Sequence, residues 1–182
     1  MRYDWWYWDS VLTTQEIKEL NQRLDQVAFK DRDVYGKEAK KTSEVKFVFY
    51  GDIKDKIKNL MDKALMSNRD YFGYNLFPPN DLETLLYNTY SGDKKGEYDY
   101  HHDTNFCDYN DTKLSLVINI SQNKYKGGDF YIFSPHRNEP VKEFSKPGDM
   151  ILFKSYHFHK VKPVTKGERK SLSYFFMGPK FI

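Results

Sequence analysis

The sequence contains one cysteine, only three alanines and no long apolar run, and these scarcities exclude several classes of protein. With Cys107 alone, we expect neither an internal disulfide nor a cysteine-rich zinc site. No window approaches the roughly 20 consecutive apolar residues of a membrane-spanning helix, and Met1–Asp9 lacks the pattern of a signal peptide. The formal charge of +3 is too small to indicate a nucleic-acid-binding surface. We therefore expect a cytoplasmic protein that binds neither nucleic acid nor membranes.

Aromatic residues, in contrast, are abundant. The chain has 14 Phe, 15 Tyr and 3 Trp, and a core built from rings suits sheets better than a helical bundle. A length of 182 residues predicts a single domain, 1–182. Within it we expect a helical support segment over residues 1–80 and a β-rich core that carries the functional site over residues 81–182.

The support segment contains two predicted helices. Apolar residues recur at helical spacing over Thr13–Phe29 and over Asp52–Gly73. Thr13 and Glu16 have the spacing of a capping box at the start of the first helix. Between the helices, Val45–Tyr50 has the pattern of a strand.

From Leu82 onward the apolar period changes from 3.6 to 2, which is typical of strands. Seven runs of this kind are separated by turn residues, and together with the helices they predict a mainly β (α+β) fold. The expected architecture is a two-sheet barrel or jelly roll backed by the helices. The predicted strands are Leu82–Tyr90, Glu97–Asp103, Lys113–Ile120, Gly128–Phe133, Asp149–Phe153, His157–Lys162 and Ser171–Phe176.

A possible metal site begins in the second of these strands. Strand alternation places His101 and Asp103 on one face, and an imidazole beside a carboxylate provides two of the three ligands of a 2-His-1-carboxylate iron site. The third ligand must come from a facing strand. His136 lies in a proline-containing loop and is the weakest candidate, whereas spacing alone does not choose between His157 and His159.

The residues after His159 favour it as the third ligand. Arg169 follows ten residues later, beyond a turn at Lys166–Gly167 and at the start of the next strand. A guanidinium near a metal site is suited to a bidentate interaction with a carboxylate. We interpret His102 and His157 as supporting or structural residues, since each lies beside a better placed histidine.

Residues 87–176 resemble the 2-oxoglutarate- and Fe(II)-dependent oxygenases of the prolyl 4-hydroxylase type, in their short single-domain bacterial or phage form. Six motifs occur in the order found in that family. They are a tyrosine–glycine motif at Tyr90, H-x-D at His101, the Gly127–Gly128 pair, Pro147–Gly148–Asp149, H-x-V-x-P-V from His159, and G-x-R ending at Arg169.

This resemblance implies a fold and a set of roles. The fold is a double-stranded β-helix, of the jelly-roll or cupin-like kind, backed by two helices. His101, Asp103 and His159 would bind iron, and Arg169 would pair with the distal carboxylate of 2-oxoglutarate. Tyr90 would line the co-substrate pocket. The family often has a hydroxyl group on the strand after H-x-D that assists the arginine, and Ser115 is the candidate for it.

The resemblance also implies a reaction. Fe(II) would be the metal, 2-oxoglutarate and O2 the co-substrates, and ascorbate an additional cofactor to test. The expected reaction is hydroxylation of an amino-acid side chain, proline in a protein or peptide, coupled to decarboxylation of 2-oxoglutarate to succinate and CO2.

Three other functions compete with this interpretation. A nucleic-acid demethylase of the same superfamily would carry a second arginine six residues after Arg169, where this chain has Phe175. A non-catalytic jelly-roll binding module would have lost the metal, although all three ligands are present. A cupin-like metal enzyme that uses no 2-oxo acid would leave Arg169 without a role.

Two further segments each allow two interpretations, and two tyrosines are assigned to the core. The loop Asp31–Ser43 could be a substrate lid or a solvated loop. The Trp5–Trp8 cluster could bind a peptide, but we favour an N-terminal strand packed against the helices. Tyr98 and Tyr100 are predicted to lie in the core, on the face opposite the metal ligands.

Overall fold

The described part of the N-terminal segment contains two α-helices and two strands. The computed structural model describes residues 3–30, 40–104, 109–133 and 140–180, so His136, Cys107 and most of the predicted Asp31–Ser43 loop lie outside the described residues. The elements of this segment are β1 (Trp5–Trp8), α1 (Thr14–Val27), β2 (Glu44–Phe49), α2 (Tyr50–Ser67) and the π-helical turn η1 (Asn68–Phe72).

The predicted helix boundaries agree closely with the structure. Thr13 is the N-cap of α1, and the reciprocal hydrogen bonds of its capping box with Glu16 are both present. α2 follows β2 directly, two residues earlier than predicted, and the helical path then ends at Gly73, whose φ of 73° is left-handed. No helix in the described ranges is both long and apolar enough to cross a membrane.

The remainder of the described chain is β structure. The strands are β3 (Thr84–Ser91), β4 (Tyr98–His101), β5 (Asn110–Asn119), β6 (Lys126–Gly127), β7 (Phe130–Ile132), β8 (Met150–Lys154), β9 (His159–Val161), β10 (Val164–Lys166) and β11 (Glu168–Pro179). All seven predicted strands occur. The sequence analysis missed β6 and β10, because strands of two and three residues are too short to show a period of two.

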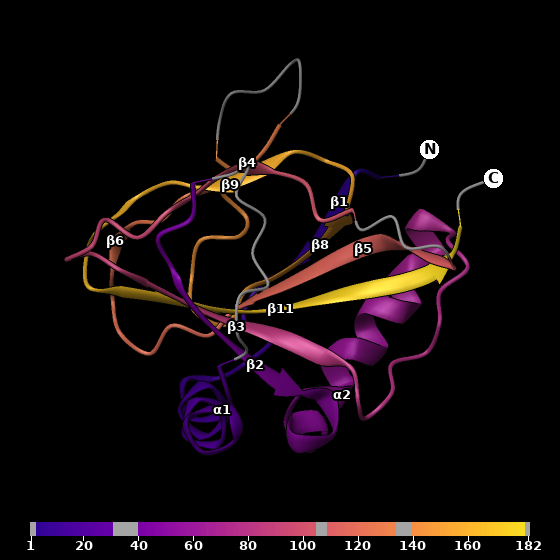
Figure 1. Ribbon diagram of the computed structural model, residues 1–182, viewed down its shortest axis with the longest axis horizontal. Helices are drawn as coiled ribbons and strands as arrows, with labels where there is room; N and C mark the ends of the chain where they lie inside the picture. The colour runs from indigo at the N-terminus through magenta and orange to yellow at the C-terminus, as the bar shows by residue number, and fades with distance from the viewer. Residues whose placement is uncertain (1–2, 31–39, 105–108, 134–139, 181–182) are drawn as a thin grey trace.

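The strands form one large antiparallel sheet and two small ones. The large sheet has the order β1-β8-β5-β11-β3-β2, a second sheet has the order β4-β9-β7, and β6 pairs with β10. Figure 1 shows α1 and α2 beneath the large sheet, with β4 and β9 on its other side. The N-terminal segment therefore supplies the two edge strands of the large sheet as well as the helices that cover it.

Two apolar cores lie on opposite faces of the large sheet. The helices pack against one face, where Leu24 and Leu60 join Leu116 and Leu172 in one cluster of buried residues. On the other face, Phe153 of the large sheet packs with residues of the second sheet. Each core removes apolar surface from water, the main favourable contribution to folding, and the second core surrounds the functional site described below.

Strand β5 shows how the sequence produces these two faces. The alternation predicted for it is observed, because Leu114, Leu116 and Ile118 face the helices, whereas Ser115 and Val117 face the space between the sheets. Since both faces are covered, the strand is buried over nearly its whole length. The polar side chains on the inner face are therefore placed where they can serve a site.

β1 combines two roles. It extends the large sheet by pairing with β8, with Trp6 opposite Leu152. The Trp6 ring also lies 4.2 Å from the Tyr71 ring of η1, centroid to centroid, and packs against the helix-side core. The predicted packing of an N-terminal strand against the helical segment is therefore present, with sheet pairing added to it.

Asn21 of α1 connects the helices to the sheet by hydrogen bonds. Its side chain is 1% exposed, its amide donates to the carbonyl oxygens of Ile17 and Ile120 at 2.9 Å, and its Oδ1 accepts from the Tyr87 hydroxyl. Replacement of a buried hydrogen-bonding group leaves its partners unsatisfied. We expect Asn21→Ala to lower the free energy of unfolding by about 2 to 3 kcal/mol, measured by urea denaturation.

Asn59→Ala is the matched control, because Asn59 is an exposed asparagine on α2. It should change the free energy of unfolding by less than about 0.5 kcal/mol. Equal effects of the two substitutions would show that the Asn21 hydrogen bonds do not stabilise the helix–sheet interface.

Candidate functional site

Two histidines and an aspartate converge where β4 and β9 pair. His101 is the last residue of β4 and lies opposite His159, the first residue of β9, while Asp103 follows β4 by two residues. Asp103 Oδ1 is 3.6 Å from His101 Nε2, and Asp103 Oδ2 is 3.4 Å from His159 Nε2. The candidate ligand atoms of all three residues lie within 4.8 Å of one another. The structure thus brings together the three residues predicted to bind iron.

Both imidazoles are oriented in the same way by the backbone. His101 Nδ1 lies 2.7 Å from the carbonyl oxygen of Asp99, and His159 Nδ1 lies 3.0 Å from that of His157. A carbonyl oxygen only accepts, so each Nδ1 donates its proton and each Nε2 keeps a lone pair. The two Nε2 lone pairs are therefore available for a metal. Metal-binding histidines typically donate the proton of their other ring nitrogen in this way.

Two serines hold the aspartate. The Ser115 hydroxyl donates to Asp103 Oδ2 at 2.7 Å and lies 2.9 Å from the Ser155 hydroxyl, and the Asp103 backbone N–H donates to the Ser155 carbonyl. The prediction that Ser115 assists Arg169 finds no support in these contacts, which place its hydroxyl on the aspartate. Arg169 Nη1 instead lies 3.5 Å from the Ser171 hydroxyl.

The cluster fits a divalent metal by charge and by spacing. Burial lowers the pKa of both His101 and His159 to about 4, so both imidazoles are neutral near pH 7, the form that binds metals. Burial also raises the pKa of Asp103, and a cation beside its carboxylate would offset that cost. Ligand atoms in an octahedral site with bonds of about 2.1 Å lie about 3 Å apart. Three protein ligands leave the other positions open, as in 2-His-1-carboxylate Fe(II) sites.

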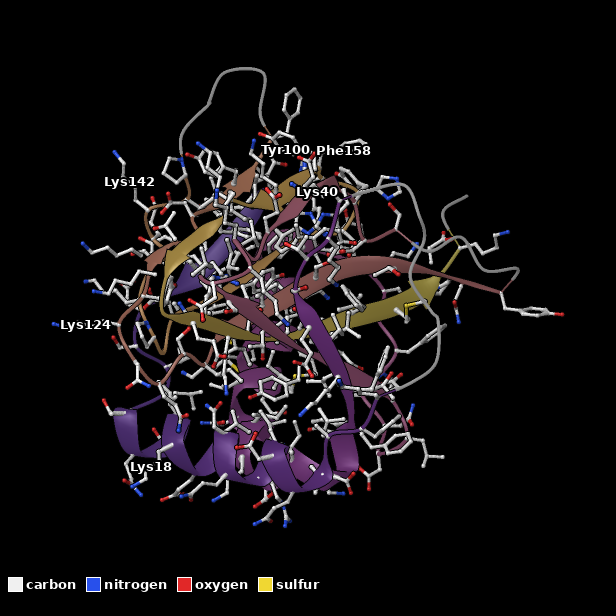
Figure 2. All side chains as sticks on the ribbon, turned by 60° about the vertical axis from the view of Figure 1, so that its left-hand side comes forward. Lys18, Lys40, Tyr100, Lys124, Lys142 and Phe158 are labelled. Carbon is white, nitrogen blue, oxygen red and sulfur yellow. The ribbon has the colours of Figure 1, made fainter. Side chains whose placement is uncertain are left out.

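The other histidines lie elsewhere. His157 Nε2 is 3.3 Å from Asp4 Oδ1, outside the cluster, and His102 is exposed. His136 is not among the described residues. Figure 2 shows Tyr100, which precedes His101, and Phe158, which precedes His159, at the end of the molecule opposite Lys18 of α1. Geometry therefore selects His159 where spacing left two candidates.

Tyr98 lies on the same side of β4 as the cluster, which strict alternation did not predict. The pairing of β4 with β9 shifts register between Tyr98 and His101, so residues three apart share a face. The two rings are stacked with centroids 3.4 Å apart. Tyr98 packs against the inter-sheet core as predicted, but it also lines the cavity at the metal cluster.

A cavity of about 120 Å³ extends from the cluster into the space between the sheets. Arg169 lines it and is 2% exposed. Its guanidinium carbon lies 5.4 Å from the centroid of the Tyr90 ring, which is also buried and lines the cavity. No aspartate or glutamate among the described residues forms an ion pair with Arg169. Because a buried charge is costly without a counter-ion, this arginine is suited to binding an anionic ligand.

Asn88 adds an unsatisfied polar atom to the same cavity. Its Oδ1 is buried and has no hydrogen-bond partner among the described residues. The sequence analysis missed this residue, although its signal was present. Asn88 lies two residues before Tyr90 on β3, as Ser171 lies two residues after Arg169 on β11, and a period of two places each pair on one face. A ligand of the arginine would thus meet additional polar groups.

Gly128 of the predicted glycine pair makes room for Arg169. Its φ is +72°, a conformation that other residues rarely adopt, and an added Cβ would lie 2.9 Å from Arg169 Cδ. The glycine therefore lets the backbone approach the arginine stem closely.

Lys41 was not identified from the sequence, yet it lines the cavity. Its Nζ lies 4.4 Å from the centroid of the Tyr98 ring. Burial lowers the pKa of Lys41 to about 8, and the Asp103 carboxylate acts in the opposite direction. No local pattern indicated this position, because Lys41 belongs to a polar segment that was read as a loop.

Comparison with known proteins agrees with this geometry. A family model described as the 2OG-Fe(II) oxygenase superfamily matches residues 85–177, just over half of the chain. A PKHD-type hydroxylase of Herminiimonas arsenicoxydans is 29% identical over 171 residues, which cover 88% of this chain and 72% of that protein. A PKHD-type hydroxylase of Parvibaculum lavamentivorans is 31% identical over 113 residues, covering 62% and 49% of the two chains.

Solved structures share the fold at low sequence identity. A prolyl-4-hydroxylase of Pseudomonas putida superposes with a TM-score of 0.67 at 20% identity, covering 98% of this chain and 94% of that one. A Trichoplax adhaerens prolyl hydroxylase in complex with a hypoxia inducible factor peptide gives 0.68 at 17% identity, covering 95% and 83%. The predicted fold class, a double-stranded β-helix backed by helices, is confirmed.

Proposed function

Because this chain belongs to the 2OG-Fe(II) oxygenase superfamily, we propose that it hydroxylates a prolyl residue of a protein or peptide, by prolyl 4-hydroxylation. The proposed reaction converts 2-oxoglutarate and O2 to succinate and CO2. One observation carries the proposal: the same cavity is lined by a cluster suited to a metal and by a buried arginine. That arginine has no acidic partner among the described residues. A 2-oxo acid with a second carboxylate can bind the metal at one end and the arginine at the other.

In this proposal His101, Asp103 and His159 hold Fe(II), which supplies the oxidative chemistry when it is bound. The backbone carbonyl groups at Asp99 and His157 keep both imidazoles in the metal-binding tautomer. The Ser115 hydroxyl fixes one oxygen of the aspartate, which keeps the ligand set ready before any co-substrate enters.

Arg169 binds the distal carboxylate of the co-substrate in this proposal. Its charge and fork of N–H donors match a carboxylate. Tyr90 covers one side of the guanidinium, and the Ser171 hydroxyl lies 3.5 Å from it. Because these residues are buried, water is largely excluded, which strengthens the interaction of the charges.

Proline is proposed as the target from the named relatives. Those at 29% and 31% identity are called PKHD-type hydroxylases, and the two structural neighbours described above are prolyl hydroxylases, one of them solved with a peptide. At the position where a nucleic-acid demethylase would carry its second arginine, Phe175 lines the cavity. We also propose that ascorbate supports turnover by keeping the iron ferrous. The cytoplasmic location stays a prediction.

Anaerobic titration tests the proposed chemistry. We expect the Fe(II)-loaded protein to develop a weak visible charge-transfer band on addition of 2-oxoglutarate, because a 2-oxo acid can occupy two open metal positions. Admission of O2 should remove the band and form succinate. A proline-containing peptide substrate should then gain one oxygen atom by mass spectrometry.

The metal alone provides the control, since Fe(II) without 2-oxoglutarate should give no such band. Iron binding without the band in the presence of 2-oxoglutarate would favour a cupin-like enzyme that uses no 2-oxo acid. Absence of metal binding would contradict the proposed function.

A further inference from the structure

Among the described residues, two lysine or arginine side chains line the cavity, and the proposed function uses only one of them. Arg169 is the first, and Lys41 is the second. The Lys41 ammonium lies above the Tyr98 ring at 4.4 Å, and the same ring stacks on His101. Lys41 therefore lies at the metal end of the cavity. Arg169 instead contacts Tyr90 and Ser171 of the large sheet.

The backbone holds Lys41 in this position. Residues 40–42 run antiparallel to the edge of β4, where Lys41 pairs with Tyr98. The Lys40 carbonyl accepts from the Asp99 N–H at 2.9 Å, and the Thr42 N–H donates to the Glu97 carbonyl at 3.0 Å. A lysine carried on a hydrogen-bonded segment is placed more precisely than one on an unpaired loop, which indicates a built position rather than a chance contact.

A carboxylate bound at the metal end of the cavity would meet charges of opposite sign. Asp103 is a carboxylate that acts on the charge of Lys41, and a divalent cation at the cluster would take up the charge of Asp103. A carboxylate bound beside that cation would lie at the same end of the cavity as the Lys41 ammonium, where the low dielectric strengthens the attraction between opposite charges.

We infer that Lys41 is a second carboxylate-binding residue, which binds the 2-oxo acid end of the co-substrate beside the metal while Arg169 binds the distal carboxylate. This inference rests on the proposed function. It specifies the ligand as a dicarboxylate held at both ends, and it gives the two cations separable roles. An acidic side chain of the peptide substrate is the competing partner for Lys41.

Two probes separate these roles. 2-Oxoglutarate carries both carboxylates, whereas 2-oxovalerate has the same chain length and lacks the distal one. The binding of each acid to the Mn(II)-loaded protein would be measured anaerobically by calorimetry. We expect Lys41→Met to weaken both acids by about tenfold, the effect of losing one charged hydrogen bond. Arg169→Met should weaken 2-oxoglutarate alone.

Lys40→Met is the matched control. Lys40 is the adjacent lysine, but it is exposed and pairs with Glu97. Figure 2 shows Lys40 at the same end of the molecule as Tyr100 and Phe158. We expect this variant to bind both acids like the parent protein. Lys41→Arg keeps the charge and should recover most of the affinity, which distinguishes a lost contact from a disturbed fold.

The possible results separate the two proposals. Unchanged binding of both acids by the Lys41→Met variant would overturn the inference and leave the proposed function intact. Weakening of 2-oxoglutarate alone would also overturn it, because Lys41 would then serve the distal carboxylate. Failure of the Mn(II)-loaded parent protein to bind either acid would overturn both proposals.

Discussion

Replacing His159 by alanine is expected to abolish tight Fe(II) binding and, with it, the formation of succinate. His159 has a side chain that is 5% exposed, and its Nε2 lies 3.4 Å from the Asp103 carboxylate. Only two protein ligands would remain. Since mutation of a residue that merely supports a ligand costs about 10- to 100-fold in metal affinity, loss of the ligand itself should cost more. Competition with a chelator of known affinity would measure this.

His157→Ala is the control for this experiment. His157 is the alternative ligand that the sequence left open, and its imidazole contacts Asp4 instead of the cluster. The carbonyl group that orients His159 belongs to the backbone, so the substitution preserves it. We expect metal affinity within about threefold of the parent, because the three ligands and the hydrogen bonds from the Nδ1 atoms of His101 and His159 are unchanged. Retained iron binding in the His159 variant, with loss in the His157 variant, would reverse the assignment.

The sequence predicted those parts of the site that lie on regular strands. His159 and Arg169 were both assigned correctly to strands, although β10 separates these strands in the chain and they belong to different sheets. The alternation of β5 placed Ser115 on the inner face. Period-two reasoning works there because the pleat sends successive side chains to opposite faces. It did not predict that each face of the large sheet carries its own apolar core.

The parts that could not be predicted depend on irregular backbone or on contacts between distant segments. The register shift in β4 turns Tyr98 onto His101, and nothing in the local sequence marks such a shift. Lys41 reaches the cavity only because its segment adds to the edge of β4. Ser115 was predicted to assist Arg169, and only the folded arrangement shows that its hydroxyl donates to Asp103.

Arg169→Met is expected to raise the 2-oxoglutarate requirement by about 100-fold or more, because the distal carboxylate would then be buried without its partner. Methionine retains an unbranched apolar stem, so the close packing of this side chain against Gly128 is kept. Metal affinity should stay unchanged, since the guanidinium contacts Tyr90 and Ser171 rather than the ligands. Steady-state succinate formation and chelator competition would measure the two quantities.

The same substitution should leave the free protein at least as stable as the parent, and this outcome separates a binding role from a structural one. A fully buried guanidinium without an acidic partner among the described residues costs solvation energy in the free protein. Its replacement by an apolar side chain removes that cost, as is common where a site is built for function at the expense of stability. Thermal unfolding without ligand provides the measurement. A marked fall in the midpoint would mean that Arg169 stabilises the fold, and the increased co-substrate requirement would then reflect a damaged cavity.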